Sequence, residues 1–391
     1  MGVKNTAYVN KEMLIWARNE TPFATTEDVE AHSSAITAEK LSKWESGEDL
    51  PSVNEAKRLA SIYKVPFACF YLSEIPEKKP KPYTDRRTAL GTSYDGISYD
   101  LWSEIQRIIS NRECLIEFSD EDDIISIPTV TDTSVEGIAK QIRDFLELKT
   151  PLKNKTAYGS NPFNYFRDIL ESKNIMVSQI SGVSLKEMKG ISMYYDRFPI
   201  VAVNNKDFDN AKVFSLFHEL AHIFRRSASL CLIDFDERND REEKICDLIA
   251  AEVLMPKECF EVIAKTYTEK SGSDWDSAML HKLGGRFGIS AVSALMRLYE
   301  TQLILRDDYR SLFEQMLQEF ESKRNAIEAA RKGRENKLPF AVKYLSGTGH
   351  LLPRTMILSH ASGKISLGEM CKILNIKSSH IGRIEQAVMY K

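Results

Sequence analysis

Two histidines lie four residues apart in the segment Phe214-Ser-Leu-Phe-His-Glu-Leu-Ala-His-Ile-Phe224, at His218 and His222. The apolar residues of this segment recur at helical spacing, which predicts an amphipathic helix. Because side chains at positions i and i+4 share one face of a helix, both imidazoles can reach one metal ion. Glu219 lies about a quarter-turn round, near a metal-bound water but outside the ligand set. The spacing is typical of zinc sites that hydrolyse peptide bonds, and the alternative is two histidines that only pack on an amphipathic helix.

The residues before this segment predict how the helix is introduced. The run Phe198-Pro-Ile-Val-Ala-Val203 is apolar and rich in branched side chains, which predicts a strand. Asp209 and Asn210 offer an N-cap between that strand and the helix. A strand that leads directly into a histidine-bearing helix therefore forms the expected frame of the site.

A second predicted helix supplies candidates for a third metal ligand. It covers residues 240–255 and ends at Pro256, which cannot continue a helix. Glu243 and Asp247 share one face, so Glu243 can donate a carboxylate to the metal while Asp247 accepts the second ring N–H of a ligand histidine. Glu242 is the rival ligand, although no acidic residue follows it four positions later. The alternative for these acids is a solvated helix face.

Residues 190–256 resemble the ImmA/IrrE family of metallopeptidases. Members carry a strand that ends in Asn, then a Phe-x-x-x-His-Glu-x-x-His helix, then Glu-x-x-Ala-Asn-x-Phe-Ala-x-x-Leu-Met-Pro. This chain has Pro199-Ile-Val-Ala-Val-Asn204, the segment from Phe214 to His222, and Glu243-Lys-Ile-Cys-Asp-Leu-Ile-Ala-Ala-Glu-Val-Leu-Met-Pro256. The departures from the family pattern are Cys246 for Ala, Asp247 for Asn and Ile249 for Phe. Asp in place of Asn keeps a hydrogen-bond acceptor, so a role in orienting a ligand survives.

The resemblance implies a zincin-like core with Zn²⁺ held by His218, His222 and Glu243. It implies that Glu219 acts as the general base, which takes a proton from the zinc-bound water and passes it to the leaving amine. Family members cleave transcriptional repressors, so the expected partner is a protein substrate of that kind. In zincins an extended substrate pairs with an edge strand of the sheet, and the strand near residues 191–203 is the candidate neighbourhood.

Residues 1–75 resemble a helix-turn-helix domain of the Xre/Cro type, through Trp44-Glu-Ser-Gly-Glu-Asp-Leu-Pro-Ser52 and Leu59-Ala-x-x-Tyr-x-Val-Pro66. Helices are predicted at 10–20, 25–31, 36–46 and 52–63. The third would present Thr37, Glu39, Lys40, Ser42 and Lys43 to a DNA groove or to a partner protein. These 75 residues contain 8 Lys/Arg and 11 Asp/Glu, which offers little attraction to phosphate. The sequence therefore leaves open whether this domain binds DNA or docks a protein.

The rest of the chain is divided by pattern into smaller parts. Residues 76–150 read as a linker, with a basic turn at 83–88, and a helical segment with helices from Leu101 and Val135. The peptidase domain is expected at 151–275. It is followed by a helix-turn-helix-like unit at 276–305, a charged helix within 306–340, and a small helical domain at 341–391 with a turn at Asn375. For this last domain, DNA binding and a docking or capping role both fit.

Composition limits the cellular setting. The net charge of −3 gives no overall attraction to nucleic acid, and 43% hydrophobic residues suffice for real cores. The 6 cysteines are scattered without a Cys-x-x-Cys pair, which favours reduced thiols in the cytoplasm. No apolar run approaches the 18 residues of a membrane span, so no membrane association is expected.

The predicted fold is therefore α+β and predominantly α-helical, with a zincin-like core flanked by helix-turn-helix-type domains. The favoured function is a zinc-dependent endopeptidase that cleaves a regulatory protein, with latent activity until signalled. The alternative is an antitoxin or transcriptional regulator of a toxin-antitoxin or mobile-element module, which binds a toxin partner and has latent or no peptidase activity. The two differ in their dependence on Glu219.

Overall fold

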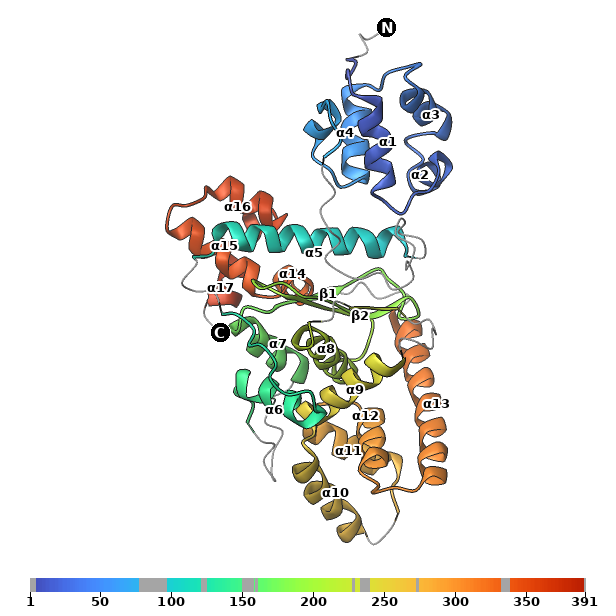
Figure 1. The fold of residues 1–391 in the computed structure, drawn as a ribbon, viewed down its shortest axis with the longest axis vertical. Coiled ribbons are helices and arrows are strands. Elements are labelled where there is room, and N and C mark those ends of the chain that lie inside the picture. The colour runs from blue at the N-terminus through green and yellow to red at the C-terminus, as the bar shows by residue number, and fades with distance from the viewer. Residues whose placement is uncertain are drawn as a thin grey trace. The chain divides into compact units, whose positions relative to one another are not determined.

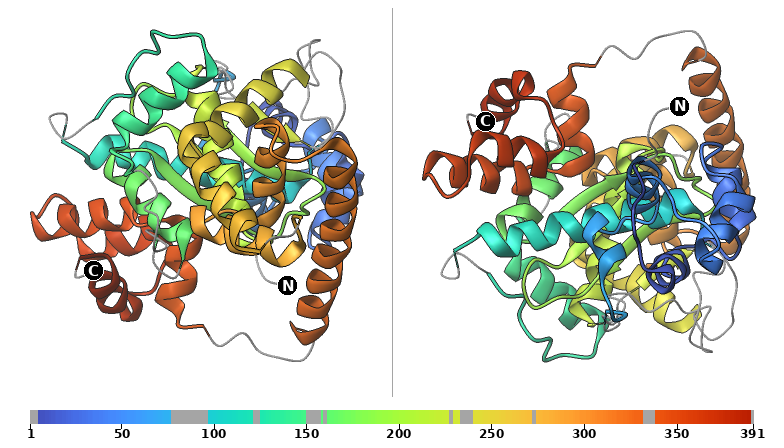
Figure 2. Two further views of the ribbon diagram at one scale, coloured as in Figure 1. Left: turned by 90° about the horizontal axis from the view of Figure 1, so that it is seen from below. Right: turned by 90° about the horizontal axis from the view of Figure 1, so that it is seen from above.

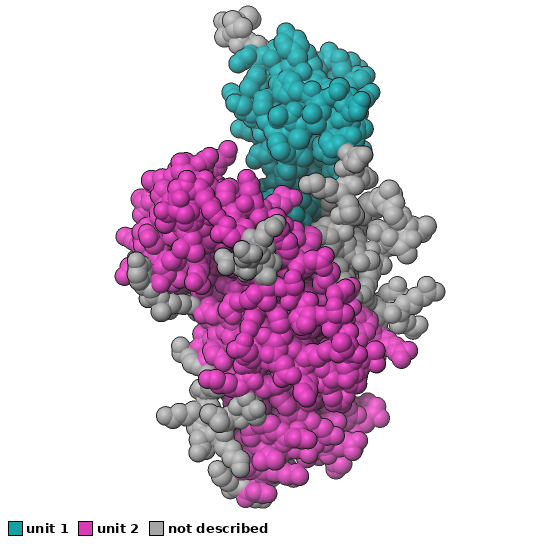
Figure 3. Space-filling model, turned by 60° about the vertical axis from the view of Figure 1, so that its left-hand side comes forward, with its two compact units in different colours: residues 1–81, 85–110 teal, residues 82–84, 111–391 magenta. Residues whose placement is uncertain are grey.

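A computed structural model describes residues 5–76, 97–120, 125–149, 158, 161–226, 229–232, 240–271, 274–331 and 338–389. The chain forms two compact units, which Figure 3 colours separately. Unit 1 comprises residues 1–81 and 85–110, and unit 2 comprises residues 82–84 and 111–391. The basic turn predicted at 83–88 lies outside the described residues. The finer division into six parts stays a prediction.

Unit 1 is a helical bundle around one core. Its helices are α1 (Lys11–Asn19), α2 (Thr26–His32), α3 (Ala38–Ser46), α4 (Val53–Ile62), the 3₁₀ helix η1 (Phe67–Tyr71) and the part of α5 (Tyr99–Phe118) up to Ser110. The four helices predicted in residues 10–63 are confirmed to within two residues. Side chains of Thr25, Thr37 and Ser52 cap three of them, and Gly47 ends α3 with φ of 84°, a conformation that favours glycine.

Unit 2 contains a four-stranded sheet with the order β1-β3-β2-β4. The strands are β1 (Met176–Ile180), β2 (Met188–Met193), β3 (Ile200–Asn204) and β4 (Ser229–Leu232). β1 runs parallel to β3, whereas β2 runs antiparallel to both β3 and β4. The strand predicted at 198–203 is confirmed as β3, and all five of its residues are buried, as expected for a central strand.

Helices cover this sheet and extend beyond it (Figure 1). Those before the C-terminal region are α6 (Val135–Phe145), α7 (Pro162–Ser172), α8 (Asp209–Phe224), α9 (Asp240–Leu254), α10 (Lys257–Ser271), α11 (Ser277–Phe287), α12 (Ala291–Glu300) and α13 (Arg306–Arg331). α8 packs on β2, β3 and α9, and α8, β3 and α9 contribute to one large hydrophobic core. The helix pair predicted at 276–305 is confirmed as α11 and α12, with Gly288 in the left-handed region between them. The charged helix is confirmed as α13.

The C-terminal helices are α14 (Phe340–Thr348), α15 (Leu351–Ala361), α16 (Leu367–Leu374), the 3₁₀ helix η3 (Ser378–His380) and α17 (Ile381–Met389). They lie on the opposite side of the sheet from α13 (Figure 2). α14 contacts the edge strand β1, where the Gln179 side chain donates to the Ser346 carbonyl at 2.8 Å. The α+β, predominantly helical fold is therefore confirmed. No helix in the described part of the chain combines the length and apolar character needed to cross a membrane.

A buried carboxylate attaches the C-terminal helices to α7. Glu171 accepts hydrogen bonds from the His350 backbone N–H at 2.9 and 3.1 Å, just before α15 begins. Gly349 makes this approach possible, because a Cβ at that position would lie 2.1 Å from Glu171 Oε1. Burial raises the pKa of Glu171 to about 7, although the nearby Arg167 guanidinium acts in the opposite direction. The junction is thus sensitive to the charge on one side chain.

Candidate metal centre

Helix α8 carries both histidines of the predicted motif. It begins at Asp209 with Phe208 in the N-cap position, so the prediction of Asp209 or Asn210 as the N-cap is wrong by one or two residues. The physical reason is that the Asp209 carboxylate instead pairs with Lys212 one turn later, at 2.7 Å. An acidic residue in the first turn still stabilises the positive end of the helix dipole.

The structure brings one donor atom each of His218, His222 and Glu243 to a common point. The His218 Nε2–Glu243 Oε2 distance is 3.0 Å, the His222 Nε2–Glu243 Oε2 distance is 3.4 Å and the two Nε2 atoms are 3.2 Å apart. Metal–ligand bonds of about 2.0–2.1 Å in a tetrahedral zinc site place the donors about 3.3 Å from one another. The three donors therefore fit a tetrahedral metal ion with one position left for water or substrate.

Electrostatics favours the ligand form of Glu243. Burial opposes ionisation of this carboxyl group, but hydrogen bonds with His218 and His222 outweigh burial and hold the pKa of Glu243 well below its usual value. The group is therefore an anion at neutral pH, as a metal ligand must be.

The outer nitrogen of each histidine also has a partner. Asp247 Oδ1 lies 2.8 Å from His218 Nδ1, where the sequence predicts a carboxylate that orients a ring. Cys246 Sγ lies 3.5 Å from His222 Nδ1. Burial raises the pKa of the Cys246 thiol to about 12, so the thiol is neutral at physiological pH. It contacts Nδ1 of His222, the ring nitrogen that faces away from the proposed metal position. The sequence did not reveal this role for Cys246, because no pattern of spacing distinguishes it from an ordinary buried thiol.

Glu242, the rival ligand, is turned to another partner. Its two carboxylate oxygens accept hydrogen bonds from Arg225 Nε and Nη2 at 2.7 and 2.8 Å. A bidentate pair of this kind fixes the carboxylate in one plane. Arg225 thereby holds Glu242 at the end of α8, and Glu243 is left to face the histidines.

Glu219 is buried against strand β2, with 1% of its surface exposed. The residue that makes room for it is Gly190, where an added Cβ would lie 2.5 Å from Glu219 Oε1 and 2.8 Å from its Cγ. Any larger residue at position 190 would displace the Glu219 side chain. The sequence does not point to Gly190, because its partner is 29 positions away on another element.

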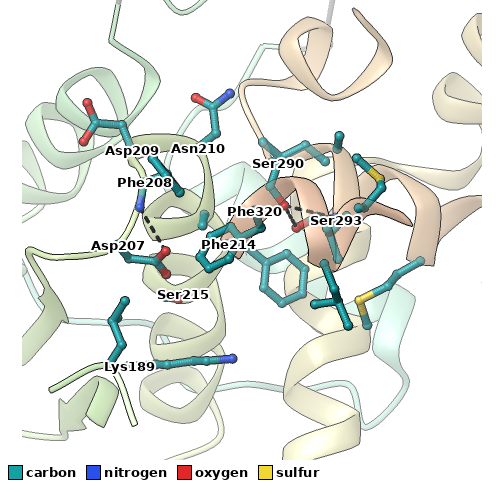
Figure 4. Close-up of a pocket in the computed structure, with 18 of the residues that line it drawn as sticks. Lys189, Asp207, Phe208, Asp209, Asn210, Phe214, Ser215, Ser290, Ser293 and Phe320 are labelled. Atoms are coloured by element: carbon teal, nitrogen blue, oxygen red, sulfur yellow. Dashed lines mark hydrogen bonds between the residues drawn. The ribbon is translucent and has the colours of Figure 1, made fainter. Parts of the chain in front are cut away.

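A pocket of about 800 Å³ adjoins this centre and includes Asp247 in its wall. Figure 4 shows Phe214 and Ser215 of α8 on one side and Ser290, Ser293 and Phe320 on the other. Other walls come from Lys186, from Lys189 of β2, from His281 of α11 and from residues of α12 and α13. An apolar lining with a few polar groups is typical of sites that bind side chains of a substrate.

The strand order of the sheet decides which strand has a free edge to which an extended substrate could be added. Strands β2 (188–193) and β3 (200–204) overlap the predicted neighbourhood at 191–203, and both are internal, because β2 pairs with β4 and β3 pairs with β1. The sequence left open which strand forms the edge. Among the described strands, the edge next to β2 is β4, so substrate pairing beside residues 191–203 stays a prediction.

Comparison with known families places the centre in context. Residues 171–299 match the family model of Peptidase M78, the IrrE N-terminal-like domain. The match extends from the end of α7 to α12 and contains His218, Glu219, His222, Glu243 and Asp247. It supports the resemblance for this part of the chain and implies a metallopeptidase-type hydrolase domain that uses a metal ion. No curated protein matches the chain.

The residues proposed for DNA or partner binding in unit 1 are exposed on or next to α3. Lys40 pairs with Glu55 at 3.1 Å and Lys43 pairs with Glu39 at 2.6 Å. The Thr37 hydroxyl caps α3, and Ser42 Oγ lies 3.3 Å from Thr26 Oγ1. The Xre/Cro resemblance and the binding role of these four residues stay predictions.

A second cluster of metal-ligand types, Asp168, Glu171 and His350, occurs at the α7–α15 junction. His350 Nδ1 lies 3.0 Å from Asp168 Oδ1, but its Nε2 lies 3.4 Å from the Arg167 guanidinium. A cation beside the donors disfavours a metal ion, and Glu171 is already engaged by backbone N–H groups. This cluster therefore joins helices rather than forming a metal centre.

Proposed function

We propose that unit 2 contains a zinc-dependent endopeptidase that cleaves a regulatory protein of the transcriptional-repressor class. The observation that carries the proposal is the convergence of His218, His222 and Glu243 donors within 3.4 Å on two packed helices. The match to a metallopeptidase family over the same residues supports it. The repressor as substrate rests on the family resemblance alone.

The residues of the centre have three different roles in the proposed reaction: metal binding, proton transfer and orientation of a histidine. Zinc bound by His218, His222 and Glu243 would supply Lewis-acid polarisation of the scissile carbonyl and lower the pKa of a water. The Glu219 carboxylate accepts the proton that the attacking water loses and then donates it to the nitrogen of the leaving amine. Asp247 accepts the His218 Nδ1–H and thereby fixes the tautomer that leaves Nε2 free to bind.

Metal analysis of the purified full-length protein tests the site. We expect about one zinc per chain in the wild type, loss of zinc in His218→Ala and Glu243→Ala, and retention in Glu242→Gln, the matched control on the same helix. A wild type that binds no zinc after chelation and reloading would overturn the proposal. Equal zinc loss in the Glu242 control would overturn the ligand assignment.

Cellular cleavage tests the chemistry. Labelling of protein N-termini should reveal a new N-terminus in cells with the wild type that is absent with Glu219→Gln, since the Gln variant keeps zinc but has no proton acceptor. Biological activity that is retained in the Glu219→Gln variant would instead support the antitoxin-type regulator. The zinc measurement is independent of this outcome, so failure of the site and failure of the activity are distinguishable.

A further inference from the structure

The charge of the chain is distributed unevenly, and the C-terminal segment 338–389 is one of its basic parts. Six Lys or Arg and two acidic residues give this segment a net charge of +4, although the whole chain carries −3. The basic residues are Lys343, Arg354, Lys364, Lys372, Lys377 and Arg383. A basic helical segment on an acidic chain is the electrostatic pattern of a surface that binds polyanions.

The two acidic residues of the segment are Glu369 and Glu385, and the excess of four positive charges remains after both are counted. Glu369 is occupied in a capping box, where its carboxylate accepts from the Ser366 N–H at 2.8 Å. Lys364 is the one basic residue of the segment that pairs with an acid in the described part of the chain, Asp120 at 2.7 Å. The exposed Lys372, Lys377 and Arg383 therefore retain their charge toward solvent.

The segment contains two short helices joined by a tight connection. α16 is followed by its C-cap Asn375, which adopts φ of 51° and ψ of 45°, and the Ile376 N–H closes the turn on the Cys371 carbonyl at 3.0 Å. Residues 375–377 separate α16 from η3, and α17 follows η3 directly. Both helices pack on α15, with Met370, Leu374 and Ile384 buried at the contact. A short turn between two helices that share a supporting helix is the DNA-binding arrangement.

The free face of the second helix is polar and open. On a helical projection Gly382 and Gln386 lie opposite the buried Ile384, with Arg383 on one flank of this face and Glu385 on the other, and the exposed Ser379 precedes the helix in η3. An added Cβ at Gly382 would meet nothing within 4 Å, so this face is unobstructed. Arg, Gln and Ser are among the side chains that read base edges in the major groove, and Arg383 lies in the first turn of α17, where such contacts occur.

We propose that α16 and α17 bind duplex DNA, with α17 in the major groove. Arg383 and Gln386 contact base edges, and Lys372 and Lys377 contact phosphates on either side of the turn. No large hydrophobic side chain is exposed on α17, which disfavours insertion into a membrane surface. The α3 face of unit 1, whose lysines are already paired with Glu39 and Glu55, is the weaker candidate for the same role.

The test uses the full-length, zinc-loaded protein and a random library of 20-base-pair duplexes, followed by fluorescence anisotropy on the enriched sequence. We expect enrichment of a defined sequence by the wild type. Lys372→Ala and Lys377→Ala should each reduce the slope of log affinity against log salt by about one. Arg383→Ala should reduce the preference for the enriched sequence by roughly 5- to 150-fold, and Arg383→Lys should keep the salt slope without restoring the preference.

The matched control removes two lysines of unit 1, Lys40→Ala and Lys43→Ala together. We expect this variant to bind the enriched DNA as tightly as the wild type does. Helix content and zinc content should be unchanged in all variants, which shows that they are folded. Absence of DNA binding at low salt, or equal weakening by the control and by Lys372→Ala with Lys377→Ala, would overturn the proposal. Binding to phosphatidylserine vesicles but not to DNA would also overturn it.

Discussion

Replacement of Gly190 by Ala tests how strand β2 holds the candidate general base. The new Cβ would lie 2.5 Å from Glu219 Oε1, 2.8 Å from Cγ and 3.0 Å from Cδ, and ordinary contacts are about 3.5–4.0 Å. Glu219 must therefore move by about 0.5–1 Å, although it is 1% exposed and β2 is paired on both sides. Overpacking of this size destabilises a protein by about 1–3 kcal/mol.

Calorimetry of the zinc-loaded protein measures this effect. If the proposed site binds zinc only when it is folded, the transition of unit 2 is the one that a chelator lowers. We expect Gly190→Ala to lower its midpoint by roughly 2–12 °C, since 1 kcal/mol corresponds to about 2–4 °C for a unit of this size. Zinc content should be unchanged, whereas cleavage should fall by about 100-fold, because a 1 Å displacement of a reacting group has that effect.

A double-mutant cycle decides whether Glu219 is the cause. Removal of the side chain in Glu219→Ala should relieve most of the penalty of Gly190→Ala, which gives a coupling free energy of about 1–3 kcal/mol. Gly285→Ala is the matched control, since an added Cβ in α11 meets nothing within 4 Å. A Gly190→Ala protein as stable as the wild type, or a penalty that persists without Glu219, would refute the reasoning.

Two further predictions concern hydrogen bonds at the centre and at the α7–α15 junction. Asp247→Ala should weaken zinc binding by about 10- to 100-fold, measured in competition with a chromogenic chelator. The Asp247→Asn variant keeps a hydrogen-bond acceptor and should keep most of the zinc affinity. An Asp247→Ala variant with the zinc affinity of the wild type would contradict the role of Asp247 in orienting His218. Burial raises the pKa of Glu171 from 4.5 to about 7, so between these pH values the folded state keeps a proton that the unfolded state releases. The free energy of unfolding of the wild type should therefore fall relative to Glu171→Gln as the pH rises through this window, and a difference that is independent of pH would count against it.

Periodicity in the sequence was enough to predict the elements that carry the centre. The 3.6-residue repeat places His218 and His222 on one face of α8, and it places Glu243 and Asp247 on one face of α9. The two faces then come together because each helix buries its apolar stripe against the other. The choice of Glu243 over Glu242 also followed from the sequence, through the acidic residue one turn later.

The partners of these residues came only from the tertiary structure. Gly190 shapes the space for Glu219, Cys246 lies beside His222, and Arg225 holds Glu242 away from the histidines. Each of these contacts depends on how two elements pack, which local patterns do not encode. The same holds for the strand order, since pairing of β4 with β2 decides which backbone edge remains for a substrate.

The sequence by itself thus determined the helices and the residue types that can bind a metal, because these depend on spacing along one chain segment. It also determined that the C-terminal segment is basic, although not what that charge faces. Only the tertiary structure decided which donors converge, which strand is an edge and which side of α17 is open. The physical reason is that these properties arise from contacts between residues far apart in the chain, such as Glu171 and His350, which are 179 positions apart.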